Sequence, residues 1–579
     1  MSTVELRADV VVVGAGAAGM YAAITARKGG ADVLLLDKSM VGRGGATVMA
    51  QMTVAAALGA EEPDNWHLHA ADTLAGGREI NNEPLVDLLC AEGPRRILET
   101  RAMGVRWATE GDHIHQVMAP GHSRRRCCYV GTLATGTGLI TGLQKELQRL
   151  EVRRRSGIFV ADVILDDAGR VAGVAGFDAD RGDLVAIWAP AVILAGGGLT
   201  EMYARNSASV NMTADAHALA LRAGATLVDM EMVQFFPIAH LAPRLIGLDP
   251  IMWDPFRYRL GGRLLNGEGE EFLERYAGVA DEGTYTATRD VVTYAILKEV
   301  AAGRGTPHGG AWLDFRGIPK EQIRAVFAPV VDKLLAQGID LTERAVEVAP
   351  MAHYTIGGVE ADADMATGVP GLFAAGEAVG GAHGANRLSG NAITEALAFG
   401  PRAGERAAAY AHGQGAEADA TARVQMHDRL ARLEAVPGRN AASTIMLPVL
   451  RHRLQQVMWD RVGPFRTEEG LQQAERELAE LRERDFPAAR VGATRSFNRE
   501  WLEWCEFENM LLAAEAVVLA ARERRESRGA HQREDYPEMR PEFVKNSTVA
   551  RAEGGLRHRW RAVMRRSIDV APAEEVVVR

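Results

Sequence analysis

The first residues with a recognisable chemical task form a glycine-rich turn, GAGAAG, near the N-terminus. Gly14, Gly16 and Gly19 have the spacing G-x-G-x-x-G and stand between a β-branched run, ADVVVV, and a helix-forming segment, MYAAITARKG. The first glycine permits a tight turn, the second lets a pyrophosphate approach the backbone, and the third lets helix and strand pack closely. Together with Ala17, they predict a pyrophosphate site at a helix N-terminus, where free N–H groups favour an anion.

The acidic residue expected beside such a turn is Asp37, which ends the next strand-like run, ADVLLLDK. Its carboxylate can accept hydrogen bonds from ribose hydroxyls, and Lys38 follows it at the same edge. A lone glycine pattern would be weak evidence. Strand, turn, helix, strand and acidic residue in register predict a dinucleotide-binding βαβ unit over residues 8–40.

Two distant segments indicate which dinucleotide binds. Gly196 lies in the glycine cluster LAGGG, and Glu377 follows another strand-like run in LFAAGE. A ligand touched by three segments so far apart in the chain must be long and deeply enclosed. FAD fits that description better than NAD.

Composition limits the remaining possibilities. The chain has 579 residues, is 47% hydrophobic and carries a net charge of −10, which argues against nucleic acid as a partner. It has no run of about 18 apolar residues, so we expect no direct membrane insertion. Its N-terminus lacks the features of a signal peptide. We predict a cytoplasmic protein; peripheral attachment to a membrane through a partner subunit stays open.

The chain has four cysteines and no C-x-x-C pair, which argues against a zinc or iron–sulfur site within it. Cys127 and Cys128 are adjacent. They form either a redox pair or, as we favour, two buried small side chains.

Changes in pattern divide the chain into units. The runs within 160–198 indicate a small antiparallel addition followed by a buried parallel strand, and residues 231–350 interrupt this rhythm before VPGLFAAGE resumes it. Beyond about residue 405 the pattern is helical; Leu471, Ala474, Leu478 and Leu481 share one helix face. We predict a split first domain (1–230 and 351–405), an inserted domain (231–350), a helical domain (406–535) and a C-terminal domain (536–579).

The order of the motifs resembles one family. GAGAAG, RCCYVGTLATGTG, LAGGG, MVQFFP, LLNGEGEEFLERY, TRDVV, AHYTIGGV, VPGLFAAGE, HGANRLSGN and ESRGAHQREDYP follow as in the succinate dehydrogenase/fumarate reductase flavoproteins, which include L-aspartate oxidase. Adenylylsulfate reductase flavoproteins are also relatives, but HGANR looks more like the dicarboxylate branch. The resemblance implies the α/β fold class: a Rossmann-like FAD-binding domain with an inserted α+β capping domain, then a helical and a C-terminal domain.

The resemblance also implies how the cofactor is held. Glu377 would bind part of it, and the helix starting at NAITEALAFG would point its N–H groups at the flavin, which favours the anionic reduced form. Membrane-bound members attach FAD covalently through a histidine; here Ala46 stands in its place, so we predict non-covalent FAD and a lower potential that favours reductases or oxidases. The further residues expected at the cofactor are Gly45, Thr47, Asp215, Asn391, Ala392 and Ile393.

Three residues match the family's catalytic positions. By resemblance, Arg289 in TRDVV would shuttle a proton and His353 in AHYTIGG would bind a substrate carboxylate. Arg387 in HGANR would clamp the same carboxylate with its two-pronged guanidinium and also touch the cofactor. The alternative for each is a purely structural role.

The other half of the family site is different here. The pattern V-Q-F-H-P, whose histidine binds the second carboxylate, reads VQFFP, so Phe236 replaces the imidazole. An ungapped alignment puts the family's Thr-Glu pair on Asp254 and Pro255, and His240 is a candidate replacement. A second substrate carboxylate would be poorly solvated there and repelled by Asp254. We expect a substrate with one carboxylate and an apolar, neutral or cationic group near Phe236.

Four functions remain open from the sequence. The first is an FAD-dependent oxidoreductase acting on a small carboxylic acid, with electrons passing to a separate iron–sulfur subunit. The second is a true fumarate reductase or succinate dehydrogenase subunit in which His240 binds the second carboxylate, and the third is an L-aspartate-oxidase-like enzyme. The fourth, an idle FAD-binding subunit, is disfavoured because Arg289, His353 and Arg387 are all present.

Overall fold

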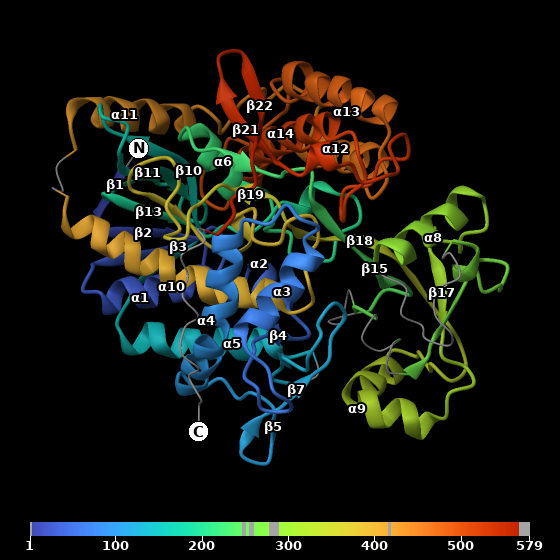
Figure 1. Ribbon diagram of the computed structural model, residues 1–579. Helices are drawn as coiled ribbons and strands as arrows, with labels where there is room; N and C mark the ends of the chain where they lie inside the picture. The colour runs from blue at the N-terminus through green and yellow to red at the C-terminus, as the bar shows by residue number, and fades with distance from the viewer. Residues whose placement is uncertain are drawn as a thin grey trace.

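A parallel five-stranded sheet forms the centre of the protein (Figure 1). The computed structural model describes residues 3–131, 133–245, 251–253, 257, 260–276, 289–414 and 418–566. The sheet has the order β20-β13-β2-β3-β9, with β2 (Val10–Val13), β3 (Val33–Asp37), β9 (Arg153–Ser156), β13 (Ala191–Leu194) and β20 (Leu372–Ala374). Its central strands are buried apolar runs, as expected of a parallel sheet covered on both faces. The predicted βαβ unit is confirmed.

Two helices with small side chains pack side by side against this sheet, α1 (Ala17–Lys28) and α10 (Asn391–His412) (Figure 1). A Cβ atom on Gly400 would lie 2.4 Å from the carbonyl oxygen of Ala18, and one on Gly404 would lie 2.2 Å from that of Ala22. Both glycines are therefore required by the close approach. Because the two contacts advance together along both helices, α1 and α10 are parallel and their N-termini face the same end of the sheet.

The predicted antiparallel addition is also confirmed. Strands β10 (Ile158–Leu165), β11 (Val171–Asp178) and β12 (Leu184–Trp188) pair antiparallel, and β1 (Thr3–Arg7) adds in parallel to β12. Smaller elements complete this part of the chain: α2 (Gly45–Met49), β4 (Val54–Ala55), α3 (Trp66–Gly76), α4 (Glu83–Ala102), β7 (Gln116–Val117), β8 (Cys127–Cys128), α5 (Thr135–Arg149) and α6 (Asp215–Arg222). All four cysteines are buried and none forms a disulfide, so Cys127 and Cys128 are the buried small side chains we favoured.

The inserted part forms a separate lobe, at the right of Figure 1. Its sheet has the order β15-β18-β17-β16, from β15 (Val233–Ala242), β18 (Val346–Thr355), β17 (Ala311–Asp314) and β16 (Arg263–Leu265), with helices α8 (Arg289–Ala301) and α9 (Lys320–Ala336). The lobe has its own apolar core. The long neighbouring strands β15 and β18 carry the chain out of the main body and back (Figure 1).

The helical part contains α11 (Ala420–Glu434), α12 (Leu447–Val462), α13 (Glu468–Glu480) and α14 (Arg499–Glu523). The predicted helix face is confirmed, since Leu471, Ala474, Leu478 and Leu481 are all buried. The hairpin of β21 (Asn546–Ala552) and β22 (Gly555–Arg561) then pairs with β14 (Leu227–Val228), so the C-terminal part returns to the first domain. This order of elements confirms the predicted fold class, while the exact domain boundaries stay predictions. None of the helices in the described ranges is long and apolar enough to span a bilayer.

Candidate active site

One elongated cavity runs from the glycine turn, past the carboxyl ends of the parallel strands, to the faces of β15 and β18. Most of the predicted site residues line it, although they come from segments spread over more than 370 positions of the sequence. Those that do are Gly14, Gly16, Ala17, Asp37, Lys38, Gly45, Ala46, Thr47, Gly196, Asp215, Phe236, His353, Glu377, Arg387, Ala392 and Ile393.

The glycine turn is shaped by contacts that exclude side chains. Gly14 has φ +104°, and a Cβ atom there would lie 2.3 Å from the carbonyl oxygen of Ala195. Gly19 does not line the cavity; a Cβ atom there would lie 1.9 Å from the carbonyl oxygen of Gly14, as expected of the glycine that lets helix and strand pack closely. Its role is close packing. Gly16 faces the cavity at the start of α1, where it leaves room for an anion.

Asp37 and Lys38 hold the end of β3 in place. One Asp37 oxygen accepts from the backbone N–H of Ala15 (2.9 Å), and the other accepts from that of Ser39 (2.8 Å). The Lys38 ammonium donates to Asp215 and to Glu506 of α14, each at 2.7 Å. Burial disfavours the lysine charge, but these two carboxylates outweigh it and raise the pKa of Lys38. Sequence analysis missed Glu506, because nothing in its local pattern indicates a partner 468 positions away.

Glu377 is a partly buried carboxyl group that lines the cavity. It accepts from the backbone N–H of Thr355 (3.0 Å), and burial raises its pKa to about 7. Gly198 makes room for it, since a Cβ atom there would lie 2.4 Å from a Glu377 carboxylate oxygen. The third glycine of LAGGG, Gly198, therefore leaves space for the Glu377 carboxylate.

The start of α10 presents backbone N–H groups to the cavity. Its N-cap, Gly390, has φ +85°, and Ala392 and Ile393 line the cavity. Asn391 does not line it, and its assignment to the cofactor stays a prediction. Its side chain donates to the Thr73 hydroxyl (3.0 Å) and bonds the His69 ring (2.8 Å), because successive helix positions point about 100° apart.

His353 and Arg387 are the two residues expected from the sequence to bind a substrate carboxylate. The His353 ring on β18 bonds the Ser207 hydroxyl through Nδ1 (2.8 Å). The Arg387 guanidinium lies 4.5 Å from the ring centre of Tyr354 and donates to the carbonyl oxygen of Leu388 (2.9 Å). Both side chains line the same cavity and can face one carboxylate there.

Phe236 lines the cavity beside these cationic and polar groups. Its ring centre lies 5.3 Å from that of His353, with the planes inclined at 58°. Met52 and Met252 line the same cavity and pack in the same apolar cluster as Phe236. The side of the cavity formed by Phe236, Met52 and Met252 is therefore apolar.

His240 does not line the cavity, contrary to its assignment to the substrate pocket. Its ring donates through Nε2 to the carbonyl oxygen of Pro243 (2.6 Å) and accepts at Nδ1 from the Trp253 indole (3.2 Å). It is buried in the core of the inserted lobe. Arg289 begins α8, but its side chain lies outside what the structure describes, as does Asp254.

Comparison with known proteins identifies the family. A model described as FAD binding domain matches residues 9–393, and a second, fumarate reductase flavoprotein C-term, matches residues 451–577. The 8-methylmenaquinol:fumarate reductase flavoprotein of Wolinella succinogenes is 32% identical over 578 residues, which cover 96% of this chain and 90% of that protein. The chain belongs to the succinate dehydrogenase/fumarate reductase flavoprotein family. It is an FAD-dependent oxidoreductase.

Solved structures of this flavoprotein family agree with the fold. Mycobacterium smegmatis Sdh1 in complex with UQ1 superposes with a TM-score of 0.86 at 36% identity, covering 97% of this chain and 95% of that one. A variant of E. coli quinol fumarate reductase FrdA gives a TM-score of 0.89 at 31% identity, with 99% of both chains covered.

The cavity of this flavoprotein fits FAD. The turn at Gly14 and Gly16 puts no side chain on the cavity wall, and the two helix N-termini that line the cavity favour negative charge. Position 46 of α2 also lines it, and Ala46 offers only a methyl group. No covalent bond from that side chain to the flavin is available.

We therefore expect all of the FAD to be released when the protein is denatured. The purified yellow protein would be precipitated with acid, and flavin absorbance would be measured in the supernatant and in the washed pellet. Non-covalent binding predicts essentially complete recovery in the supernatant. Flavin absorbance that stays with the pellet would contradict the role given to Ala46.

Proposed function

We propose that this flavoprotein oxidises or reduces a small acid that has one carboxylate and an apolar group at the other end. The observation that carries the proposal is the juxtaposition of His353 and Arg387 with Phe236 in one cavity. The first two suit a carboxylate, and the third, flanked by Met52 and Met252, suits a hydrocarbon.

A second carboxylate would be disfavoured at the Phe236 end. An ionised group moved from water to an apolar surface without a hydrogen-bonding partner loses several kcal/mol. His240 offers no compensation from its present position, because its two ring nitrogens serve Pro243 and Trp253. This argues against plain fumarate or succinate as the substrate.

Of the residues proposed to act on the substrate, two would bind its carboxylate and one would transfer a proton. Arg387 would grip the carboxylate with two N–H donors, and His353, oriented by Ser207, would bind it from β18. Arg289 would donate or accept the proton on the face of the substrate opposite the flavin, as in the family it resembles. When bound, FAD supplies hydride chemistry for a C–C or C–N bond.

The cofactor residues are likewise part of the proposal. The turn from Gly14 to Ala17 would hold the pyrophosphate, Glu377 would bind part of the cofactor, and the N–H groups of Ala392 and Ile393 would face the flavin ring. A positive helix end beside the ring stabilises negative charge on it and so favours its reduction.

Crotonate and fumarate provide a matched test, because crotonate is fumarate with a methyl group in place of one carboxylate. Binding to the oxidised FAD-loaded protein would be followed through the flavin spectrum, since binding does not depend on how easily each double bond is reduced. We expect crotonate to bind about tenfold or more tightly than fumarate, a difference of at least ~1.4 kcal/mol.

Two further measurements complete this test. The variant Arg387→Gln should lose crotonate binding while keeping FAD, and anaerobically reduced protein should be reoxidised by an unsaturated or imino acid with one carboxylate. Tighter binding of fumarate together with rapid reoxidation by it would favour a true fumarate reductase instead.

We also propose that electrons pass to a separate subunit with iron–sulfur clusters. This chain has only four cysteines, all buried, and its C-terminal part matches the fumarate reductase flavoprotein model. Purification of the tagged chain from its own source should bring a cysteine-rich second chain with iron and acid-labile sulfide. An isolated chain that reacts rapidly with oxygen and makes stoichiometric hydrogen peroxide would favour the L-aspartate-oxidase-like alternative.

A further inference from the structure

The loop that carries Arg387, residues 383–388, is fixed mainly through its backbone. The N–H of Ala385 donates to the carbonyl oxygen of Gly77 (2.8 Å), and the carbonyl oxygen of Ala385 accepts from the N–H of Ala530 (2.7 Å). The Gln234 amide donates to the carbonyl oxygen of Arg387 (2.9 Å) and to the Asn386 side chain (3.0 Å). Three distant segments thus decide where this arginine sits.

The contact of the loop with the C-terminal segment leaves no room for a side chain at Gly529. Gly529 has φ +55°, and a Cβ atom there would lie 2.3 Å from the carbonyl oxygen of Ala385 and 2.8 Å from its side chain. Because the nearest of these atoms belong to the backbone of Ala385, the loop itself would have to shift to accept any side chain at position 529. Gly529 is far from Arg387 in the sequence, yet it touches the loop only two residues before this arginine.

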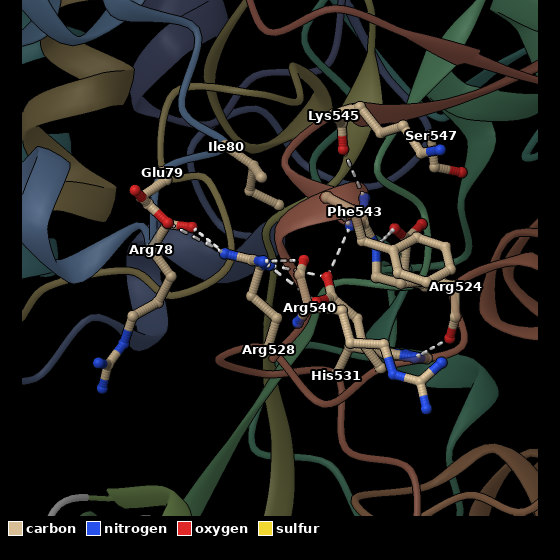
Figure 2. Close-up of polar contacts among 12 residues, drawn as sticks. Arg78, Glu79, Ile80, Arg524, Arg528, His531, Arg540, Phe543, Lys545 and Ser547 are labelled. Carbon is tan, nitrogen blue, oxygen red and sulfur yellow. Dashed lines mark hydrogen bonds and ion pairs between the residues drawn. The ribbon is translucent and has the colours of Figure 1, made fainter. Parts of the chain in front are cut away.

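The segment on the other side of this contact, residues 526–531, cannot easily move away. Arg528 is buried and donates to Glu526 (2.7 Å) and to the carbonyl oxygens of Arg78 (2.7 Å) and Arg540 (3.1 Å). Figure 2 shows its guanidinium reaching from the C-terminal segment to the backbone of Arg78 and the carboxylate of Glu79. The bonds made by Arg528 therefore tie residues 526–531 to the first domain.

A second buried arginine holds the same segment. Arg524 donates to Glu231 and to the carbonyl oxygens of Phe543 and Lys545, the last two at 3.0 Å each (Figure 2). The His531 ring donates to the carbonyl oxygen of Arg524 (3.0 Å). We call residues 526–531 the C-terminal brace.

We propose that the C-terminal brace, through Gly529, positions Arg387 for the substrate carboxylate; this inference rests on the carboxylate-binding role of Arg387 proposed above. Gly529 and Arg528 are positioning residues and do not reach the cavity themselves. The brace fixes the position of the 383–388 loop. Gly529 allows the brace backbone to contact the loop backbone at Ala385, and the hydrogen bonds of Arg528 hold the brace against the first domain. Substrate binding is thereby coupled to correct docking of the C-terminal part.

The direct test compares Gly529→Ala with Gly554→Ala. Both glycines have positive φ (+55° and +83°), but a Cβ atom on Gly554 meets nothing within 4 Å, so this control carries the backbone strain without the contact. Hydrogen–deuterium exchange of the FAD-loaded protein would be measured for the peptide that contains residues 383–390. We expect faster exchange there in Gly529→Ala and no change in Gly554→Ala.

Crotonate binding provides the functional readout. We expect the dissociation constant of crotonate to rise about tenfold in Gly529→Ala, with FAD content unchanged, and to stay at the wild-type value in Gly554→Ala. Combining Gly529→Ala with Arg387→Lys should add little further loss, because both changes act on one interaction. Fully additive losses would mean that Gly529 does not act through Arg387.

Two outcomes separate this inference from the proposed function. Unchanged exchange of residues 383–390 in Gly529→Ala would overturn the brace whatever the substrate is. A wild-type protein that binds neither crotonate nor fumarate would instead count against the proposed function, and the exchange result would still decide the brace. Should Gly529→Ala fail to fold, Arg528→Lys weakens the bonds that tie the brace to the first domain and should give the same faster exchange of residues 383–390.

Discussion

The parallel packing of α1 on α10 is the constraint on which the site depends. Gly400 and Gly404 let the two helices approach until backbone meets backbone at Ala18 and Ala22. From these contacts, α10 begins about eight residues, or ~12 Å, beyond the start of α1. Two positive helix ends therefore open into one cavity at different depths. Side-by-side parallel dipoles repel each other, and an elongated anionic cofactor across both ends offsets that repulsion.

The backbone of β15 and β18 decides where the side chain at position 236 lies, and the residue type at that position decides its chemistry. Phe236 and Met351 are partners in the β15–β18 ladder, and His353 follows two residues later on the same strand. This backbone would carry an imidazole at position 236 as readily as a phenyl ring. Under the proposed function, a single substitution there would change which group of a substrate is solvated, while the binding of the carboxylate by Arg387 would stay the same.

Sequence reasoning succeeded where a residue's role depends on its neighbours in the chain. Gly14, Gly16 and Asp37 lie in one βαβ unit, and the stripe of Leu471 and Leu478 follows from helix periodicity. The assignment of Asn391 to the cofactor rested on the helix N-terminus alone, and the structure directs its side chain toward Thr73 and His69. Glu506 and Gly529 were invisible, since their roles arise only when the C-terminal third docks on the first domain.

The position of His240 is set by a register shift in β15, which the alternation of side chains along a strand does not predict. Residues 236 and 240 are four apart, so in a regular strand both would point to the same face. The pairing of β15 with β18 shifts register between Phe236 and Ala239, which turns His240 into the core of the inserted lobe. From the sequence alone a rescuing histidine was reasonable; the shifted register makes it part of the lobe's packing.

Position 236 is therefore the residue that we expect to determine which substrates the recognition half of the site accepts. The decisive quantity is the ratio of the dissociation constants of fumarate and crotonate, measured for the wild type and for Phe236→His by flavin difference spectra. We expect an imidazole at this position to move the ratio toward fumarate by about tenfold. A ratio that stays the same, with FAD bound normally in both proteins, would show that the residue at position 236 does not select the substrate.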